Sequence, residues 1–155
     1  RLGWDHQIGG IEVRKDIPTA CGEEIGDHMV LMESGDEGEN WSEPRFILNY
    51  GEVHGHLLEL SDGRMLCTYA HYHLPYGIYA VFSEDGGKTW DTNHPIQLAT
   101  SLTVYTGWPT SIQLPCGDIL TAYAITAYEP EKDEKIAIKG QVAECVCWQL
   151  PPNIQ

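Results

Sequence analysis

The chain has 155 residues, which is enough for one domain with a hydrophobic core and too few for two ordinary domains. Nine Lys and Arg against 23 Asp and Glu give a net charge of −14, which argues against nucleic acid or an anionic membrane as a partner. No apolar run approaches the roughly 18 residues of a membrane-spanning helix, and the first residues show no signal-peptide h-region. The chain does not begin with Met, so the sequence leaves the compartment open.

The predicted strands are short apolar segments separated by polar turns. In chain order they are HMVLM (28–32), PRFIL (44–48), HGHLLEL (54–60), MLCTYA (65–70), YAVF (79–82), PIQL (95–98), GWPTSIQL (107–114), DILTAYA (118–124) and QVAECVCWQL (141–150). Helical periodicity is not convincing anywhere along the chain. The sequence therefore predicts an all-β protein.

Two repeats organise these strands. The polar segments SGDEGENW and SEDGGKTW begin at residues 34 and 83 and share Ser, Asp, Gly and Trp at the same offsets. A second repeat pairs the strand, turn and strand that start at His54 with those that start at Gly107, and both turns contain glycine. The unit is about fifty residues long with four short strands, which are the dimensions of a propeller blade.

The five cysteines predict structural thiols. Their number is odd and no CxxC pair provides zinc-ligand spacing. Cys145 and Cys147 lie two residues apart in a strand-like run, so they share one face and pair poorly with each other. We expect reduced cysteines and no metal or other cofactor.

The pattern S-x-D-x-G-x-[ST]-W resembles the Asp-box, or BNR repeat, of the six-bladed propellers in the sialidase superfamily. The resemblance covers roughly residues 27 to 150. It implies a structural box in which Asp36 and Asp85 accept backbone N–H groups of their own turns, while Trp41 and Trp90 pack into the blade. The residues that match the box are Ser34, Asp36, Gly38, Trp41, Ser83, Asp85, Gly87 and Trp90.

The repeat places one blade that ends near Leu48, a second at about 53–98 and a third at about 106–150, within a single partial propeller domain. The third blade lacks a box, and its last strand resembles the closing segment of the final blade in the family. The chain therefore resembles the C-terminal half of a six-bladed ring. Half a ring exposes sheet edges, so we expect a homodimer or further sequence to complete the propeller.

The resemblance also sorts the loops by face, with Asp-boxes on one face and the sialidase-like pocket on the other. The loops expected at the pocket are 49–56, 71–76, 102–108 and 126–134. Sialidases use a Tyr nucleophile that is activated by a Glu. Glu52 and Tyr105 are the candidates for these catalytic roles, and the alternative is that Glu52 is a solvated loop residue and Tyr105 a packing ring.

Two His-x-His pairs, His54 with His56 and His71 with His73, are expected on the same face of one blade. Four imidazoles could hold a metal, but no carboxylate or thiolate completes a recognisable spacing, which favours contact with sugar or a structural role in the loops. Three aromatic residues could stack on the CH face of a pyranose. They are Tyr72, Tyr76 and Trp108.

The arginines depart from the family pattern. Sialidases hold the substrate carboxylate with three arginines, whereas this chain has four in all and none after Arg64. The first hypothesis is a glycoside hydrolase that acts on a neutral or unusual glycan. The alternatives are a non-catalytic module that binds carbohydrate or protein, and an incomplete chain without independent activity.

Overall fold

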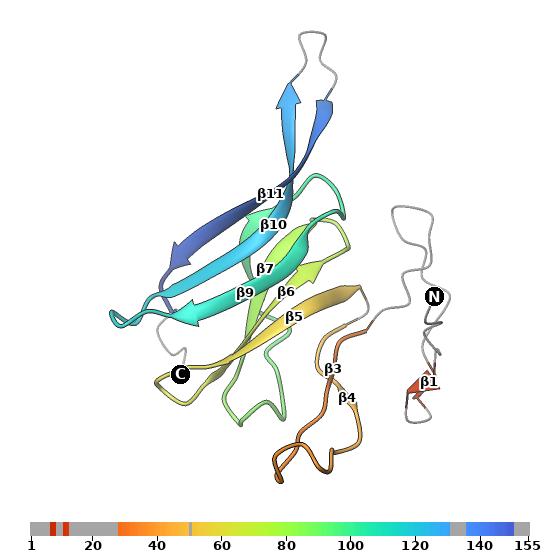
Figure 1. The fold of residues 1–155 in the computed structure, drawn as a ribbon, viewed down its shortest axis with the longest axis vertical. Helices are drawn as coiled ribbons and strands as arrows, with labels where there is room; N and C mark the ends of the chain where they lie inside the picture. The colour runs from red at the N-terminus through yellow and green to blue at the C-terminus, as the bar shows by residue number, and fades with distance from the viewer. Residues whose placement is uncertain (1–6, 9–10, 13–27, 50, 131–135, 151–155) are drawn as a thin grey trace.

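The computed structural model describes residues 7–8, 11–12, 28–49, 51–130 and 136–150, and Figure 1 shows its fold. Every regular element in these ranges is a β-strand and every strand pairing is antiparallel. The predicted all-β class is therefore confirmed. No helix in the described ranges is long and apolar enough to cross a membrane.

The central sheet is a blade of four strands in sequence order. It comprises β5 (Glu52–Glu59), β6 (Met65–His71), β7 (Gly77–Ser83) and β8 (Ile96–Thr100). The two middle strands are rich in aromatic and aliphatic residues and are almost continuously buried. Strands that are covered on both faces have this near-continuous apolar pattern.

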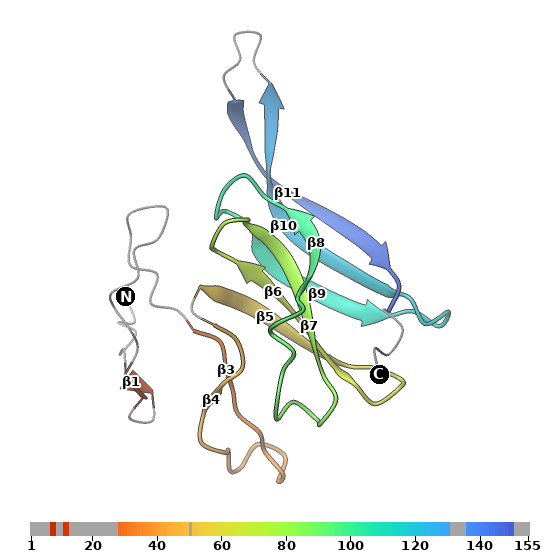
Figure 2. The same ribbon diagram turned by 180° about the vertical axis from the view of Figure 1, so that it is seen from behind.

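The C-terminal sheet has three strands, namely β9 (Gly107–Gln113), β10 (Ile119–Pro130) and β11 (Ile136–Trp148). Four strands were expected for a blade, and the described residues supply three. Strands β10 and β11 continue together beyond β9 as an arm, which Figure 1 shows at the top of the molecule and Figure 2 shows from behind.

Two further strand pairs precede the central blade. Strand β3 (Val30–Leu31) pairs with β4 (Arg45–Phe46), and β1 (Gln7–Ile8) pairs with β2 (Ile11–Glu12). The β3–β4 pair is shorter than the segments HMVLM and PRFIL that predicted it.

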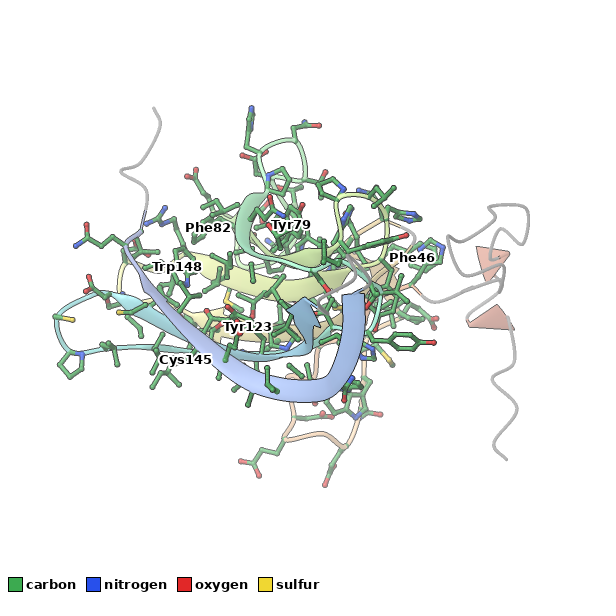
Figure 3. All side chains as sticks on the ribbon, turned by 90° about the horizontal axis from the view of Figure 1, so that it is seen from above. Phe46, Tyr79, Phe82, Tyr123, Cys145 and Trp148 are labelled. Carbon is green, nitrogen blue, oxygen red and sulfur yellow. The ribbon has the colours of Figure 1, made fainter. Side chains whose placement is uncertain are left out.

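The two larger sheets lie side by side, with β9 against β5 and β6 (Figures 1 and 2). Tyr123 from β10 is buried in the same apolar cluster as Val53 and Ile78 of the central blade. Near the other end of the sheets, Phe82 and Trp148 meet edge to face with ring centroids 6.3 Å apart, and Figure 3 shows them on the same side of the molecule.

A buried chain of hydroxyl groups crosses the same interface. Thr68 Oγ1 lies 3.0 Å from Ser111 Oγ, which lies 2.9 Å from Thr121 Oγ1. The indole N–H of Trp148 donates to Thr121 Oγ1 at 3.0 Å. All three hydroxyl-bearing residues are fully buried, so these bonds satisfy polar groups that water does not reach.

Both Asp-boxes form the same hydrogen-bonded turn. Asp36 Oδ1 accepts the backbone N–H of Asn40 at 2.9 Å, and Asp85 Oδ1 accepts that of Thr89 at 2.8 Å. Hydrogen bonds to each carboxylate, led by those from the side chains of Asn40 and Thr89, lower the pKa of Asp36 and of Asp85. Each carboxylate therefore holds the backbone of its own turn.

The two box tryptophans differ in their packing. Each indole N–H donates to the carbonyl of its box glycine, Gly38 or Gly87. Trp90 also packs against the apolar cluster of the central blade, whereas Trp41 is 59% exposed. The expectation that Trp41 packs into a blade is wrong. Strands β3 and β4 have only two residues each, so little sheet surface is present for the indole, which lies on its own turn instead.

Candidate functional site

The loops that were expected at the pocket are joined in pairs by hydrogen bonds. The backbone N–H of Tyr72 donates to the carbonyl of Gly51 at 2.9 Å, which joins the loop after β6 to the start of β5. The hydroxyl of Thr126 donates to the carbonyl of Tyr105 at 2.7 Å, which joins β10 to the loop before β9. One pair therefore lies at the start of β5 and the other at the start of β9, and residues 131–134 of the last expected loop lie outside the described residues.

Each of these two strands begins with a β-bulge. The register of β5 shifts between Val53 and His56, and that of β9 shifts opposite the segment from Ala122 to Ala124. Within the bulges, His54 has a φ of 56° and Trp108 a φ of 51°. A non-glycine residue in this left-handed region costs about 1–3 kcal/mol, so the surrounding contacts hold both side chains in place against local strain.

The two bulges bring aromatic rings together from different sheets. The rings of His54 and Trp108 lie 4.9 Å apart between centroids, and Tyr72 meets His54 edge-on at 5.8 Å. Trp108 is 56% exposed, so much of its ring faces solvent. We call His54, Tyr72 and Trp108 the aromatic platform.

Gly107 makes the platform possible. A Cβ atom at this position would lie 2.9 Å from Cδ2 of His54, which is closer than real Cβ contacts come. The imidazole therefore packs directly on the backbone where β9 begins. Sequence reasoning did not single out Gly107 for this role, although a glycine directly before Trp108 was a signal of close approach.

Glu52 and His71 form a second cluster beside the platform. Glu52 is buried, and its Oε2 accepts the backbone N–H of Asn49 at 2.6 Å. Its Oε1 lies 3.7 Å from Nε2 of His71, and Nδ1 of the same imidazole lies 3.2 Å from the carbonyl oxygen of Pro75. The cluster thus connects the start of β5, the end of β6 and the loop that follows.

The Glu52 carboxylate influences the pKa of two groups inside the central blade. Burial, assisted by the nearby Glu52 carboxylate, raises the pKa of the Cys67 thiol to about 12. The same two causes, burial first, raise the pKa of the Tyr69 hydroxyl far above its usual range. Both groups are therefore neutral near pH 7 and add no negative charge beside Glu52.

The other predicted site residues occupy several environments. His73 packs on Gly51, with its ring 5.7 Å from that of His71. Tyr105 is exposed, and its own backbone contacts anchor it separately from the buried Glu52.

Two predicted sugar contacts are not placed for that role. Tyr76 is buried directly before β7, and Ser101 donates its N–H to the Tyr76 carbonyl, so the ring presents little surface to a ligand. His56 accepts the backbone N–H of Ser111 at its Nδ1, at 3.3 Å, and thus joins the interface between the sheets.

The two described arginines form ion pairs with acidic residues outside the aromatic platform. Arg45 pairs with Glu33 at 2.7 Å and donates to the carbonyl of Gly87. Arg64 pairs with Asp62 at 2.8 Å. Within the described ranges, no three His, Cys, Asp or Glu side chains gather as metal ligands.

Comparison with known proteins identifies a related family and a related fold. A family model described as a BNR repeat-like domain matches residues 16–120. A crystal structure of a protein of unknown function from Dyadobacter fermentans DSM 18053 superposes with a TM-score of 0.56 at 22% identity, over 86% of this chain and 37% of that chain. The chain therefore spans well under half the length of that protein. No curated protein matches.

Proposed function

Since the chain belongs to the family of BNR repeat-like domains, we propose that it recognises glycans through the aromatic platform. The observation that carries this proposal is the pair of facing bulges, which hold His54 and Trp108 ring to ring in strained backbone conformations. Strain of this kind persists where the surrounding structure enforces it, and it gathers at sites of ligand contact.

The platform suits a sugar chemically. An exposed indole has a flat apolar face that matches the CH face of a pyranose, while the polar edges of His54 and Tyr72 match its hydroxyl rim. The large negative net charge and the engagement of Arg45 and Arg64 in other contacts favour a neutral glycan over an anionic one.

Titration calorimetry with matched tryptophan variants tests this proposal. Trp41 is as exposed as Trp108 but lies in an Asp-box, so Trp41→Ala controls for the loss of an exposed indole. The probes are methyl β-galactoside and N-acetyllactosamine as neutral sugars and sialyllactose as an anionic one. We expect Trp108→Ala to raise the Kd for a neutral probe roughly tenfold, about 1.4 kcal/mol, and Trp41→Ala to leave it unchanged.

Two results would count against the platform. One is the same Kd in Trp108→Ala and in the unmodified chain. The other is an equal loss of affinity in both tryptophan variants, which would indicate a general effect of removing an exposed ring.

Glycoside hydrolysis is the second candidate function. The observation that favours it is a buried carboxyl group, that of Glu52, close to an imidazole beside the platform. In this proposal Glu52 acts as the acid or base and Tyr105 as the nucleophile. Release of nitrophenol from neutral nitrophenyl glycosides measures turnover, and equal rates in the unmodified chain, Glu52→Gln and Tyr105→Phe would remove both residues from the mechanism.

We also propose that further blades complete the ring, either from a second copy or from additional sequence. Strand β9 buries Pro109 and Ser111 but exposes Thr110 and Ile112, so one face of its sheet is uncovered. Light scattering after gel filtration at several concentrations tests this. A mass near twice 17.3 kDa supports pairing of two copies. A mass that stays at the monomer value at every concentration excludes this pairing.

A further inference from the structure

Two loops beside the aromatic platform carry large apolar side chains that face solvent. Leu74 of the loop between β6 and β7 is 77% exposed, and Leu102 and Tyr105 of the loop between β8 and β9 are 61% and 62% exposed. The two loops lie side by side (Figures 1 and 2), and the N–H of Ser101 joins them by donating to the Tyr76 carbonyl at 2.9 Å. We call Leu74, Leu102 and Tyr105 the apolar rim.

The loop between β8 and β9 buries two small polar residues and exposes two large apolar ones. Ser101 and Thr106 are buried, and the hydroxyl of Thr106 donates to the carbonyl of Ala124 at 2.8 Å. Removal of apolar surface from water would by itself bury a leucine before a serine. The hydrogen bonds of the loop therefore hold it in a conformation in which Leu102 and Tyr105 face solvent.

The loop between β6 and β7 is also held by hydrogen bonds. The N–H of Tyr72 donates to the carbonyl of Gly51 at 2.9 Å, and the hydroxyl of Tyr79 donates to the carbonyl of Pro75 at 3.0 Å. These bonds lie on both sides of Leu74, so its side chain is exposed on a fixed backbone. Apolar side chains that gather on one surface indicate an interaction site, whereas single exposed ones do not.

The segments that carry the rim contain no charged residues. Asp, Glu, Lys and Arg make up 21% of the chain, yet none occurs in residues 65–83 or 92–117. The net charge of −14 is therefore carried by other parts of the sequence. An uncharged apolar surface suits an apolar group and provides no ion pair for a charged partner.

The rim is continuous with the platform. The loop between β6 and β7 carries both Tyr72 of the platform and Leu74 of the rim, and Tyr105 lies three residues before Trp108. The hydroxyl of Thr126 fixes the Tyr105 backbone by donating to its carbonyl at 2.7 Å. A standard protein interface takes about 800 Å² from each partner, which three side chains do not supply, but they can cover one alkyl or aryl group.

We propose that the apolar rim binds the aglycone of a neutral glycoside whose sugar lies on the aromatic platform. The ligand class is then a glycoside with an alkyl or aryl group, and not an oligosaccharide that is polar along its whole length. The position of the sugar rests on the proposed function. The rim adds a second subsite, which binds by removing apolar surface from water.

Titration calorimetry with methyl β-galactoside and octyl β-galactoside tests the proposal, since the two probes differ only in the alkyl group. The octyl glycoside is used below the concentration at which it forms micelles. We expect the unmodified chain to bind the octyl glycoside about tenfold more tightly than the methyl glycoside. Leu74→Ser and Leu102→Ser should each reduce this ratio to about threefold or less and leave the Kd for the methyl glycoside unchanged.

Met32→Ser is the matched control, because Met32 is a 41% exposed apolar side chain close to the first Asp-box. This variant should retain the tenfold ratio. Equal Kd values for the two glycosides in the unmodified chain would overturn the proposal. A ratio that stays at tenfold in the double variant Leu74→Ser with Leu102→Ser would also overturn it.

Methyl spectra recorded by nuclear magnetic resonance locate the octyl group on the unmodified chain. We expect octyl β-galactoside to shift the methyl signals of Leu74 and Leu102. The methyl signals of Ile112, which is 52% exposed on β9, should stay in place. Shifts at Ile112 without shifts at the two leucines would contradict the proposal. This measurement decides the proposal even if a serine variant does not fold.

Failure of the rim and failure of the platform give different results. If methyl β-galactoside binds and the octyl group adds no affinity, the rim is excluded and the platform remains. If the methyl glycoside does not bind, while octyl β-galactoside and 1-octanol both shift the methyl signals of Leu74 and Leu102, the platform is excluded and the rim remains an apolar subsite. Binding to phosphatidylcholine vesicles without glycoside that is lost in Leu74→Ser would assign the rim to a lipid surface and overturn the proposal.

Discussion

Removing the hydroxyl of Ser111 should destabilise the interface between the two larger sheets. This side chain is fully buried and connects Thr68 of β6 with Thr121 of β10. Ser111→Ala leaves the Thr68 hydroxyl without its bridge and leaves Thr121 with only the N–H of Trp148. A buried hydroxyl that loses its partner costs about 1–3 kcal/mol, which corresponds to a fall in Tm of about 2–4 °C per kcal/mol in a domain of this size.

Urea denaturation followed by tryptophan fluorescence measures the change in unfolding free energy. Thr110→Ala on the exposed face of β9 is the control, and we expect it to change stability by no more than about 0.5 kcal/mol. The double variant Thr68→Val with Ser111→Ala should be more stable than Ser111→Ala alone, since it removes a stranded partner as well as the bridge. A double variant that loses as much as the sum of the two single variants would refute this reasoning.

Three further predictions concern other parts of the fold. Gly77→Ala should destabilise the central blade by about 3 kcal/mol or more in urea denaturation, because its Cβ would collide with the carbonyl oxygen of Ala99 on β8, and an unchanged midpoint would contradict this. The pKa of Asp85 is lowered, chiefly by its hydrogen bond from Thr89, so its stabilisation is present above the ordinary carboxyl pKa near 4 and is lost as the pH falls further. The difference in Tm between the unmodified chain and Asp85→Ala should therefore shrink on acidification, and a constant difference would show that the charge is not responsible. Burial raises the pKa of Cys67 to about 12, so iodoacetamide at pH 8 should leave Cys67 unmodified in mass spectra of the folded chain, while it alkylates the exposed thiols of Cys116, Cys145 and Cys147.

The parts of the structure that sequence reasoning predicted depend on local interactions. The Asp-box is one example, because Asp85 reaches Thr89 only four residues away and the repeat shows the whole motif twice. The strands of the central blade are a second example, since turn residues and apolar segments alternate along one continuous stretch. Such features are determined by residues that are close together in the sequence, so they can be predicted from the sequence alone.

The candidate site depended on contacts between distant segments. His54 and Trp108 meet only because two bulges from different sheets face one another, and no residue pattern within either strand specifies that encounter. The burial of Tyr76 likewise follows from its place at the start of β7. Trp41 was predicted from its motif, yet its packing depends on how much sheet surrounds the first box.

The four strands of the central blade are consecutive in the sequence, and this affects the order in which the sheets form. Each strand from β5 to β8 pairs with the next one along the chain, so only short loops have to close before the blade forms. The contacts between sheets join more distant residues, as His56 and Ser111 do across 55 positions. Loop closure becomes slower as the closing segment lengthens, so the blade should assemble first and serve as the surface on which β9 to β11 then dock.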